Sequence, residues 1–356
     1  MQTQILTTGT GESYPITVRH DLLNSIGETL TERIAPCRVM LVSDENVAPL
    51  YADRTAKSLE AAGFFVSRFV TPAGEESKSV RVFGKLLEAM CEAHLTRSDL
   101  AVALGGGVIG DLTGFAAGCY LRGIRFVQLP TTLLAAVDAS VGGKTAVNLE
   151  HGKNLAGLFH QPIGVYCDID TMRTLGDMQL RNGAAEAIKT GILGDPDLFD
   201  IFENGNYEAN LEEVITRSIA YKAKIVAEDP TEKSVRKLLN FGHTPAHAIE
   251  LLSDFAIPHG YAVAIGMSMM TRAAKSHQIV DSETCSRIIR TIARSGLDTK
   301  CPYSAKEMAK IALLDKKASG RDITVILPEA IGRCRMEKIP LSELETLLAE
   351  GLEEQA

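Results

Sequence analysis

The sequence predicts an α/β N-terminal half with a doubly wound, mostly parallel sheet, followed by a mainly α-helical C-terminal half. Up to about residue 175, short runs rich in β-branched residues alternate with helical stretches, which is typical of a parallel sheet covered on both faces. The expected strands are residues 38–42, 64–69, 100–104, 125–129 and 165–168. Past residue 176, apolar residues recur at three- and four-residue intervals, which predicts helices. The clearest of these are residues 211–228, 243–252 and 261–276.

The change of period divides the 356 residues into two domains, residues 1–175 and 176–356, in keeping with the length. Near the C-terminus, residues 322–327 and 335–339 alternate as strands do and precede a helix at residues 341–350. We expect a cleft between the joined domains, a common place for a small ligand.

Charge and cysteine content exclude several classes of protein. The net charge is -8 without a basic block, so we expect no nucleic-acid partner. The seven cysteines form no C-x-x-C pair, which indicates reduced thiols in a cytoplasmic protein. No stretch of roughly 18 apolar residues and no basic, then apolar N-terminus occurs, so neither a membrane span nor an export signal is predicted.

A glycine-rich turn follows the expected strand at residues 100–104. The motif GGGVIGD at residues 105–111 removes Cβ atoms before a helix predicted from residue 112, so that a pyrophosphate can approach the backbone. Close packing alone is a frequent reason for such turns and stays the alternative. No acid lies about 20 residues downstream to bind a ribose. Asp44 instead ends an earlier strand, residues 39–43, where its carboxylate could accept the ribose hydroxyls. This indicates a nucleotide site whose elements follow a nonstandard order along the chain.

Candidate metal ligands lie in the helical half. Glu186, His243 and His259 would supply one carboxylate and two imidazoles, which suits a catalytic zinc with an open position. His247 lies four residues after His243, on the same helix face, and the spacing alone leaves either histidine pair as ligands.

Cations gather locally in this acidic chain. Residues 122–153 contain Arg122, Arg125, Lys144 and Lys153 with few acids, which indicates recognition of phosphate or carboxylate. Further candidate cations are Lys189, Lys222, Arg236, Lys316 and Lys317. The GGKT motif at residues 142–145 is not a P-loop, because Asp138 stands where the first glycine is needed.

Several ordered motifs together resemble the 3-dehydroquinate synthase family. They are GGGVIGDL at residues 105–112, RFVQLPTTLLA at 125–135, VDASVGGKTAVN at 137–148, GKNL at 152–155, LNFGHT at 239–244 and HGYAVAIGM at 259–267. The resemblance extends from about Asp44 to Lys317. It implies a dehydroquinate synthase-like fold in which residues 1–175 bind NAD and residues 176–356 bind metal and substrate.

The resemblance also implies specific roles. Zn²⁺, with Co²⁺ as the alternative, would be bound by Glu186, His243 and His259, which leaves His247 to face the substrate or handle a proton. NAD contacts would come from Asp44, Glu75, Lys78, Gly107, Val108, Ile109, Gly110, Asp111, Thr131, Thr132, Lys144, Lys153, Thr171, Met172, Arg173 and Thr174. Substrate contacts would come from Asp138, Lys144, Asn154, Lys189, Lys222, Arg236, Asn240 and His247. Arg122 would reach the phosphate held by a neighbouring subunit, which implies a homodimer.

The family's substrate is 3-deoxy-D-arabino-heptulosonate 7-phosphate. NAD removes a hydride from C5, phosphate leaves, the hydride returns, the ring opens and an aldol step closes the carbocycle, so that no NADH accumulates. The alternatives are another sugar phosphate cyclase such as 2-deoxy-scyllo-inosose synthase, a metal-dependent polyol dehydrogenase, and a protein that binds NAD without turnover. Gly142, Gly143, Lys144, Arg236 and Asn240 favour the dehydroquinate branch.

Two departures from the family pattern concern the metal region. Tyr261 stands where familiar members have glutamate, and Pro245-Ala246 replaces a pair ending in a smaller residue. We expect them to affect the support of His259 and the start of the helix that carries His247.

Overall fold

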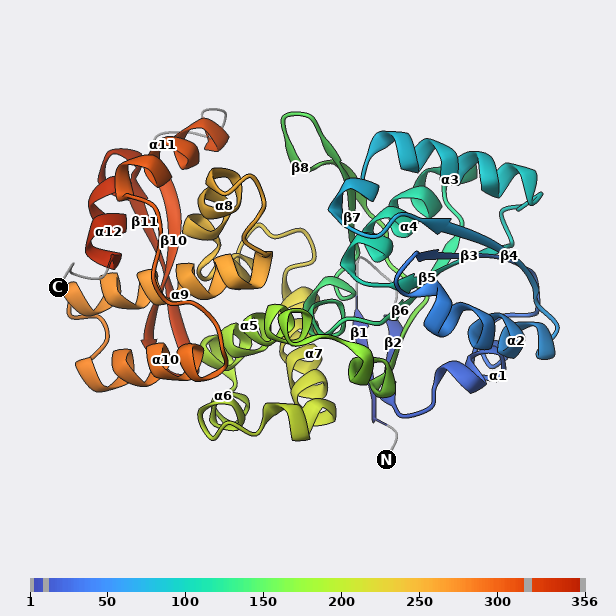
Figure 1. Cartoon of the computed structure of the whole chain (residues 1–356), viewed down its shortest axis with the longest axis horizontal. Coiled ribbons are helices and arrows are strands. Elements are labelled where there is room, and N and C mark those ends of the chain that lie inside the picture. Colours follow the sequence, from blue (N-terminus) through green and yellow to red (C-terminus); the bar gives the residue numbers. More distant parts are fainter. Residues whose placement is uncertain (1–2, 9–12, 317–321, 353–356) are drawn as a thin grey trace. The chain divides into compact units, whose positions relative to one another are not determined.

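The computed structural model describes residues 3–8, 13–316 and 322–352. The chain forms two compact units (Figure 1). Unit 1 comprises Met1–Gly176 with Lys222–Ala227, and unit 2 comprises Asp177–Tyr221 with Glu228–Ala356.

Unit 1 is built on a seven-stranded sheet with the order β1-β2-β9-β6-β5-β3-β4. Its strands are β1 (Thr3–Thr8), β2 (Ser13–Arg19), β3 (Arg38–Asp44), β4 (Phe65–Thr71), β5 (Leu100–Gly105), β6 (Arg125–Pro130) and β9 (Gly164–Asp168). The edge pair β1 and β2 is antiparallel, and each other neighbouring pair is parallel. The predicted mostly parallel sheet is therefore confirmed, while β1 and β2 were not predicted.

Helices cover both faces of this sheet because its strands are apolar on both sides. In β3, Val39 and Leu41 belong to the core shared with α1 (Ile26–Thr31) and α2 (Asp53–Ala61). Met40 and Val42 point the other way, into the core shared with α3 (Val80–Glu92) and α4 (Gly107–Cys119). This arrangement is the predicted doubly wound architecture.

Short helical turns and one hairpin complete unit 1. The turns are η1 (Leu23–Ser25), η2 (Ala48–Ala52), η3 (Glu75–Ser77), η4 (Tyr120–Arg122), η5 (Ala135–Ala139) and η6 (Ile169–Thr174). Strands β7 (Lys144–Leu149) and β8 (Gly152–Phe159) pair antiparallel, with β7 packed on α4. The cation-rich stretch therefore ends in a hairpin that the sequence did not predict.

Unit 2 is mainly helical, as predicted. Its helices are α5 (Asp177–Gly194), α6 (Pro196–Glu203), η7 (Tyr207–Asn210), α7 (Leu211–Glu228), η8 (Val235–Asn240), α8 (His243–Leu252), α9 (His259–Ser276), α10 (Ser282–Arg294), α11 (Ala305–Lys316), η9 (Leu341–Glu343) and α12 (Leu344–Gly351). Part of α7 belongs to unit 1. The predicted strands form the antiparallel pair β10 (Asp322–Ala330) and β11 (Arg333–Pro340).

Helix α9 is the centre of unit 2. It is buried along most of its length and packs against α5, α8, α10, α12 and β10. A helix that is apolar around its circumference has to be surrounded in this way. The same packing brings the N-terminal end of α9 next to α5 and α8.

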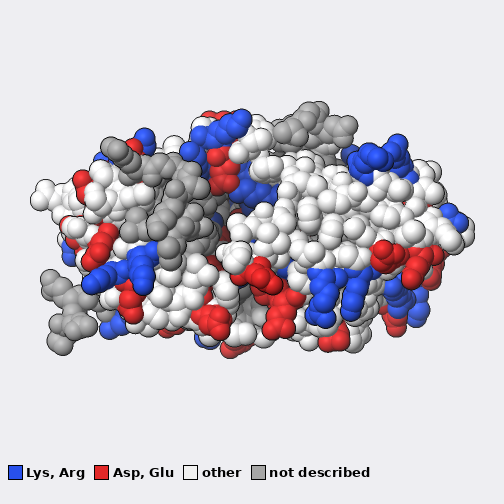
Figure 2. Space-filling view, turned by 90° about the horizontal axis from the view of Figure 1, so that it is seen from above, with Lys and Arg blue, Asp and Glu red and all other residues white. Residues whose placement is uncertain are grey.

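Charges of both signs share the molecular surface. On the face drawn in Figure 2, Lys and Arg occur in small separate groups with Asp and Glu groups among them. The described part of the chain contains no helix with the length and apolar character of a transmembrane segment.

Candidate active site

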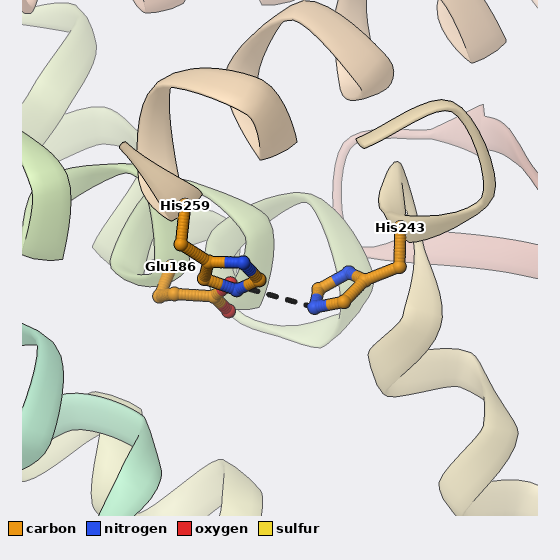
Figure 3. A group of neighbouring side chains, drawn as sticks. All are labelled: Glu186, His243 and His259. Carbon is orange, nitrogen blue, oxygen red and sulfur yellow. Dashed lines mark ion pairs between the residues drawn. The ribbon is translucent and has the colours of Figure 1, made fainter. Parts of the chain in front are cut away.

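Three side chains from three helices of unit 2 converge on one point (Figure 3). Glu186 lies within α5, while His243 and His259 are the first residues of α8 and α9. One ligand atom from each lies within 4.8 Å of the others. The Nε2 atoms of His243 and His259 lie 3.7 Å and 3.4 Å from Glu186 Oε1.

Each imidazole is oriented by a second partner. His243 Nδ1 donates to the carbonyl oxygen of Phe241 at 3.2 Å, and His259 Nδ1 lies 3.3 Å from Glu250 Oε2. Both Nε2 atoms are therefore turned toward Glu186. Metal-binding histidines commonly have this arrangement, in which the outer nitrogen holds a carbonyl or carboxylate.

The carboxylate of Glu186 is buried at 2% exposure beside the equally buried ammonium of Lys189, with which it forms an ion pair. Neither carboxylate oxygen takes part in a hydrogen bond of ordinary geometry among the described residues, so the contact with Lys189 is an electrostatic one. Buried polar atoms rarely stay in this condition without a ligand. One carboxylate with two imidazoles is a donor set that zinc accepts, and these residues fit such an ion.

The charges of the cluster shift its pKa values. Burial raises the pKa of Glu186, but Lys189 and the two histidines hold it well below its usual range. Burial and the charge of Lys189 lower the pKa of His243 to about 3. Burial also lowers the pKa of His259, yet the neighbouring carboxylates of Glu186 and Glu250 raise it to about 9.

The close approach of α9 to α5 depends on Gly260. Its amide donates to Asn182 Oδ1 at 2.7 Å, one turn before Glu186. A Cβ at this position would lie 2.0 Å from the carbonyl oxygen of Asn182. Because that contact is with backbone, a side chain here would force the two helices apart.

We therefore expect Gly260→Ala to separate His259 from Glu186, to destabilise unit 2 by about 1–3 kcal/mol and to weaken metal binding. Urea unfolding with and without zinc measures both effects. Gly84→Ala is the matched control, since Gly84 lies in α3 with nothing within 4 Å of the added Cβ. Equal behaviour of the two variants would show that Gly260 does not set the helix spacing.

The structure groups His259, rather than His247, with Glu186 and His243. The rings of His243 and His247 lie edge to face, with centroids 5.6 Å apart. Despite Pro245 and a fully buried Ala246, α8 still begins at His243. Although Tyr261 stands where a glutamate was expected, His259 still has an acidic partner, because its Nδ1 contacts Glu250.

The residues predicted to contact a dinucleotide lie on connections that follow parallel strands of unit 1. Asp44 ends β3, and Glu75 and Lys78 follow β4. Gly107, Val108, Ile109, Gly110 and Asp111 follow β5; Thr131, Thr132, Lys144 and Lys153 follow β6; Thr171, Met172, Arg173 and Thr174 follow β9. The strand order reverses between β3 and β5. Ligands of open parallel sheets bind at this edge and at such a switch point.

Helix α4 begins at Gly107, five residues before the predicted start. The amides of Gly107, Val108 and Ile109 therefore lie in the first turn, where N–H groups have no partner inside the helix. Close packing applies to a different glycine of the motif, because a Cβ on Gly110 would lie 2.6 Å from Gln128 Oε1. Close packing therefore accounts for Gly110, while pyrophosphate binding by the amides of the first turn stays a prediction.

Contacts within unit 1 bring several of these residues together. Lys78 forms an ion pair with Asp111. The hairpin is tied to the same region by Asn148, whose side chain donates to Glu75 Oε1 at 2.7 Å and whose amide donates to the carbonyl of Lys78 at 2.8 Å. In a second group, Tyr51 lies 3.3 Å from the carbonyl oxygen of Thr171.

Asp44 and Thr174 have local partners of their own. Asp44 Oδ1 accepts hydrogen bonds from the amides of Asn46 and Val47 at 2.9 and 3.0 Å, and so shapes the turn after β3. The hydroxyl of Thr174 lies 2.5 Å from the hydroxyl of Tyr51. The side chain of Tyr51, which follows the turn after β3, therefore links this turn to the segment after β9.

The predicted substrate residues belong to both units. Lys222 Nζ lies 2.8 Å from Asp138 Oδ1 and 2.5 Å from the carbonyl oxygen of Asp138. In unit 2, Lys189 adjoins Glu186, and η8 carries Arg236 and Asn240 next to α5. The side chains of Arg122, Lys144 and Asn154 are exposed. Of the lysines considered near the C-terminus, Lys317 and the side chain of Lys316 lie outside the described residues.

Several partners of these residues were not predicted. Asp229 accepts from the amides of Lys233, Ser234 and Arg236 at 2.9, 2.6 and 3.2 Å and thereby shapes the loop before η8. Glu232 Oε1 accepts from Asn240 Nδ2 at 2.7 Å. A loop carries no periodic signal that would single out either acid.

Comparison with known proteins gives relatives along most of the chain. The models of the 3-dehydroquinate synthase N-terminal and C-terminal regions match residues 68–182 and 183–318. A 3-dehydroquinate synthase from Thermoanaerobacter sp. (strain X514) is 42% identical over 343 residues, which are 94% of this chain and 96% of that protein.

Solved structures share the fold along nearly the whole chain. The 2-epi-5-epi-valiolone synthase ValA from Streptomyces hygroscopicus subsp. jinggangensis 5008, solved with NAD⁺ and Zn²⁺, has a TM-score of 0.86 at 27% identity and covers 98% of this chain and 99% of its own. A 2-deoxy-scyllo-inosose synthase complexed with carbaglucose-6-phosphate, NAD⁺ and Co²⁺ has a TM-score of 0.87 at 24% identity and covers 98% and 100%. Since both family models match in order and the relative is similar over nearly its full length, the chain belongs to the 3-dehydroquinate synthase family.

Proposed function

We propose that the chain is a 3-dehydroquinate synthase in activity as well as in family. It converts 3-deoxy-D-arabino-heptulosonate 7-phosphate to 3-dehydroquinate and phosphate, with NAD and zinc as cofactors. The observation that carries this proposal is the convergence of Glu186, His243 and His259, with both imidazoles already oriented by outer partners. Support for the cofactors comes from ValA, which was solved with both.

When bound, NAD accepts and returns a hydride, and zinc polarises a substrate oxygen. The residues of the chain bind and orient these groups and the substrate. Glu186, His243 and His259 hold the cation, and Phe241 and Glu250 fix the imidazoles so that little reorientation is needed on binding. His247 lies on the same face of α8 as His243, and we assign to it contact with the substrate or transfer of a proton.

Unit 1 is the proposed NAD-binding domain, through the residues at the carboxyl edge of its sheet. The amides in the first turn of α4 attract the pyrophosphate, because a helix N-terminus carries free N–H groups and a partial positive charge. Asp44 binds the ribose hydroxyls. Lys144 and Lys153 on the hairpin add positive charge to the same edge.

Lysine, arginine and amide side chains are the proposed substrate contacts. A dianionic phosphate needs charged donors, which Lys189, Lys222 and Arg236 provide. Lys222 is held by Asp138, so its ammonium is already fixed before a substrate arrives. Asn154 and Asn240 add neutral donors. Unit 2 thus supplies the metal ligands with Lys189, Arg236 and Asn240, and unit 1 supplies Lys222 and Asn154.

A homodimer is part of the proposal, because exposed Arg122 would then serve the phosphate site of the second subunit. The turn that carries it is unusual, with φ angles of 51° and 69° at Leu121 and Arg122. The described cysteines are all free, which fits a reducing compartment such as the cytoplasm.

The pKa values predict how zinc binding depends on pH. Zinc binds neutral imidazole. His259, with a pKa of about 9, carries a proton below that pH, whereas His243, with a pKa of about 3, does not. One proton therefore has to leave for each zinc bound at neutral pH. We expect affinity to rise about tenfold per pH unit between about pH 6 and pH 8 and to level off near pH 9.

Calorimetry in buffers of different ionisation enthalpy measures the protons released per zinc. A value near one, together with the rise in affinity, is the expected result. Affinity that does not change with pH would mean that His259 is neutral in the metal-free protein.

The activity itself is tested by incubating the pure protein with the heptulosonate phosphate, NAD and zinc. We expect equimolar phosphate and dehydroquinate without accumulation of NADH. NADH formed from glycerol instead would indicate a polyol dehydrogenase, and turnover of a different sugar phosphate alone would indicate another cyclase. Binding of NAD without phosphate release would leave only a nucleotide-binding protein.

A further inference from the structure

Helix α8 presents three polar residues on one face. His243, His247 and Glu250 are spaced at i, i+4 and i+7, so they lie one above the other along the helix. His243 and His247 have roles in the proposed function. Glu250 has no role in the proposed function, although it is a charged residue with an exposure of only 4%.

The carboxylate of Glu250 lies beside His259. Its Oε2 is 3.3 Å from His259 Nδ1, while the opposite nitrogen of the same ring is 3.4 Å from Glu186 Oε1. The imidazole is thus held between two buried carboxylates, one on each nitrogen. Burying a carboxylate without a partner is costly, and the ring is a partner of both carboxylates.

We propose that Glu250 is a positioning residue that sets the affinity and geometry of the metal centre through His259. The proposal rests on the proposed function. By accepting a hydrogen bond from Nδ1, Glu250 makes Nε2 the nitrogen that binds the cation once its own proton has left, and makes it a stronger donor to the cation. It also restrains a ring whose side chain is 32% exposed and would otherwise be free to turn.

The end of α8 does not require this side chain. The backbone carbonyl of Glu250 accepts from the amide of Phe255 at 2.8 Å and from the hydroxyl of Ser253 at 3.0 Å. These bonds close the helix whatever side chain stands at position 250. Loss of the carboxylate should therefore leave the end of α8 closed while it removes the partner of His259 Nδ1.

The test compares Glu250→Gln and Glu250→Leu with the parent protein by equilibrium competition for zinc against a chelator, and by the visible absorption spectrum of the Co²⁺ form. Glutamine keeps an acceptor oxygen but loses the charge, whereas leucine loses both. We expect zinc affinity to fall about 10- to 100-fold in Glu250→Leu and less in Glu250→Gln. The Co²⁺ spectrum should shift in both, since the orientation of one ligand changes.

Glu203→Gln is the matched control. Glu203 also lies in unit 2, where it forms an ion pair with Arg287 at 2.7 Å. This variant should keep the parental zinc affinity and Co²⁺ spectrum while losing some stability. A decrease in zinc affinity there equal to that of Glu250→Gln would mean that general loosening explains both, and would overturn the proposal.

The outcomes separate this inference from the proposed function. Parental zinc affinity and an unshifted Co²⁺ spectrum in the Glu250 variants, with affinity lost in His243→Ala, would overturn the positioning role and leave the metal centre intact. If the parent and His243→Ala bind zinc equally, the metal centre itself is wrong. If Glu250→Leu does not fold, Glu250→Gln alone decides by the same two measurements.

Discussion

Replacing His243 by alanine should remove the bound zinc and lower the rate of dehydroquinate formation about 1000-fold. The loss follows from the donor set, because His243 is one of only two imidazoles in the group with Glu186. A catalytic cation contributes several kcal/mol of charge stabilisation, and about 4 kcal/mol corresponds to this factor. Zinc content by atomic emission and phosphate release under saturating substrate measure the two effects.

His277→Ala is the control for this prediction. His277 is an exposed histidine of the same unit, in an ion pair with Glu350 at 2.6 Å. It should retain zinc and full activity. Full activity of His243→Ala without bound zinc would refute the assignment of the metal centre.

Arg236→Ala should lower kcat/KM for the heptulosonate phosphate by about two orders of magnitude while zinc stays bound. Arg236 is only 2% exposed, and its guanidinium donates to the carbonyl oxygen of Pro230 at 2.7 Å. Hydrogen bonds to a charged group contribute about 1.5–3 kcal/mol each, so losing one or two accounts for the decrease. Steady-state kinetics at limiting substrate, with zinc content measured in parallel, tests this expectation.

Two further variants sharpen this test. Arg236→Lys keeps the charge but not the planar pair of donors, so it should recover part of the rate. Arg287→Ala removes another arginine of unit 2 that is paired with Glu203, and it should leave kcat/KM unchanged. An unchanged rate at limiting substrate in Arg236→Ala would mean that the phosphate is bound elsewhere.

Much of the fold follows from local patterns. The runs that became β3, β5 and β6 are apolar enough to be buried on both faces, and they end in glycine, proline or acid. The hairpin of β7 and β8 gave no comparable signal. Its turn at Glu150 and His151 is not a usual hairpin pair, and no residue of β8 is fully buried.

The candidate site shows where sequence reasoning stops. Spacing placed His243 and His247 on one helix face, but it could not bring His259, from another helix, next to Glu186. That proximity depends on the contact of Gly260 with Asn182, which is long-range. Glu250 had a local signal, seven residues after His243, but its partner lies on a different helix.

The three candidate ligands come from separate helices, so the supply of metal affects the stability of unit 2 against unfolding. An ion bound there would join segments that are distant along the chain, and an ion that binds only the native form raises the free energy of unfolding with its free concentration. Protein synthesised during zinc starvation would then have a lower free energy of unfolding and would be degraded more readily. Scarcity of the ion would thus reduce the amount of enzyme as well as its turnover.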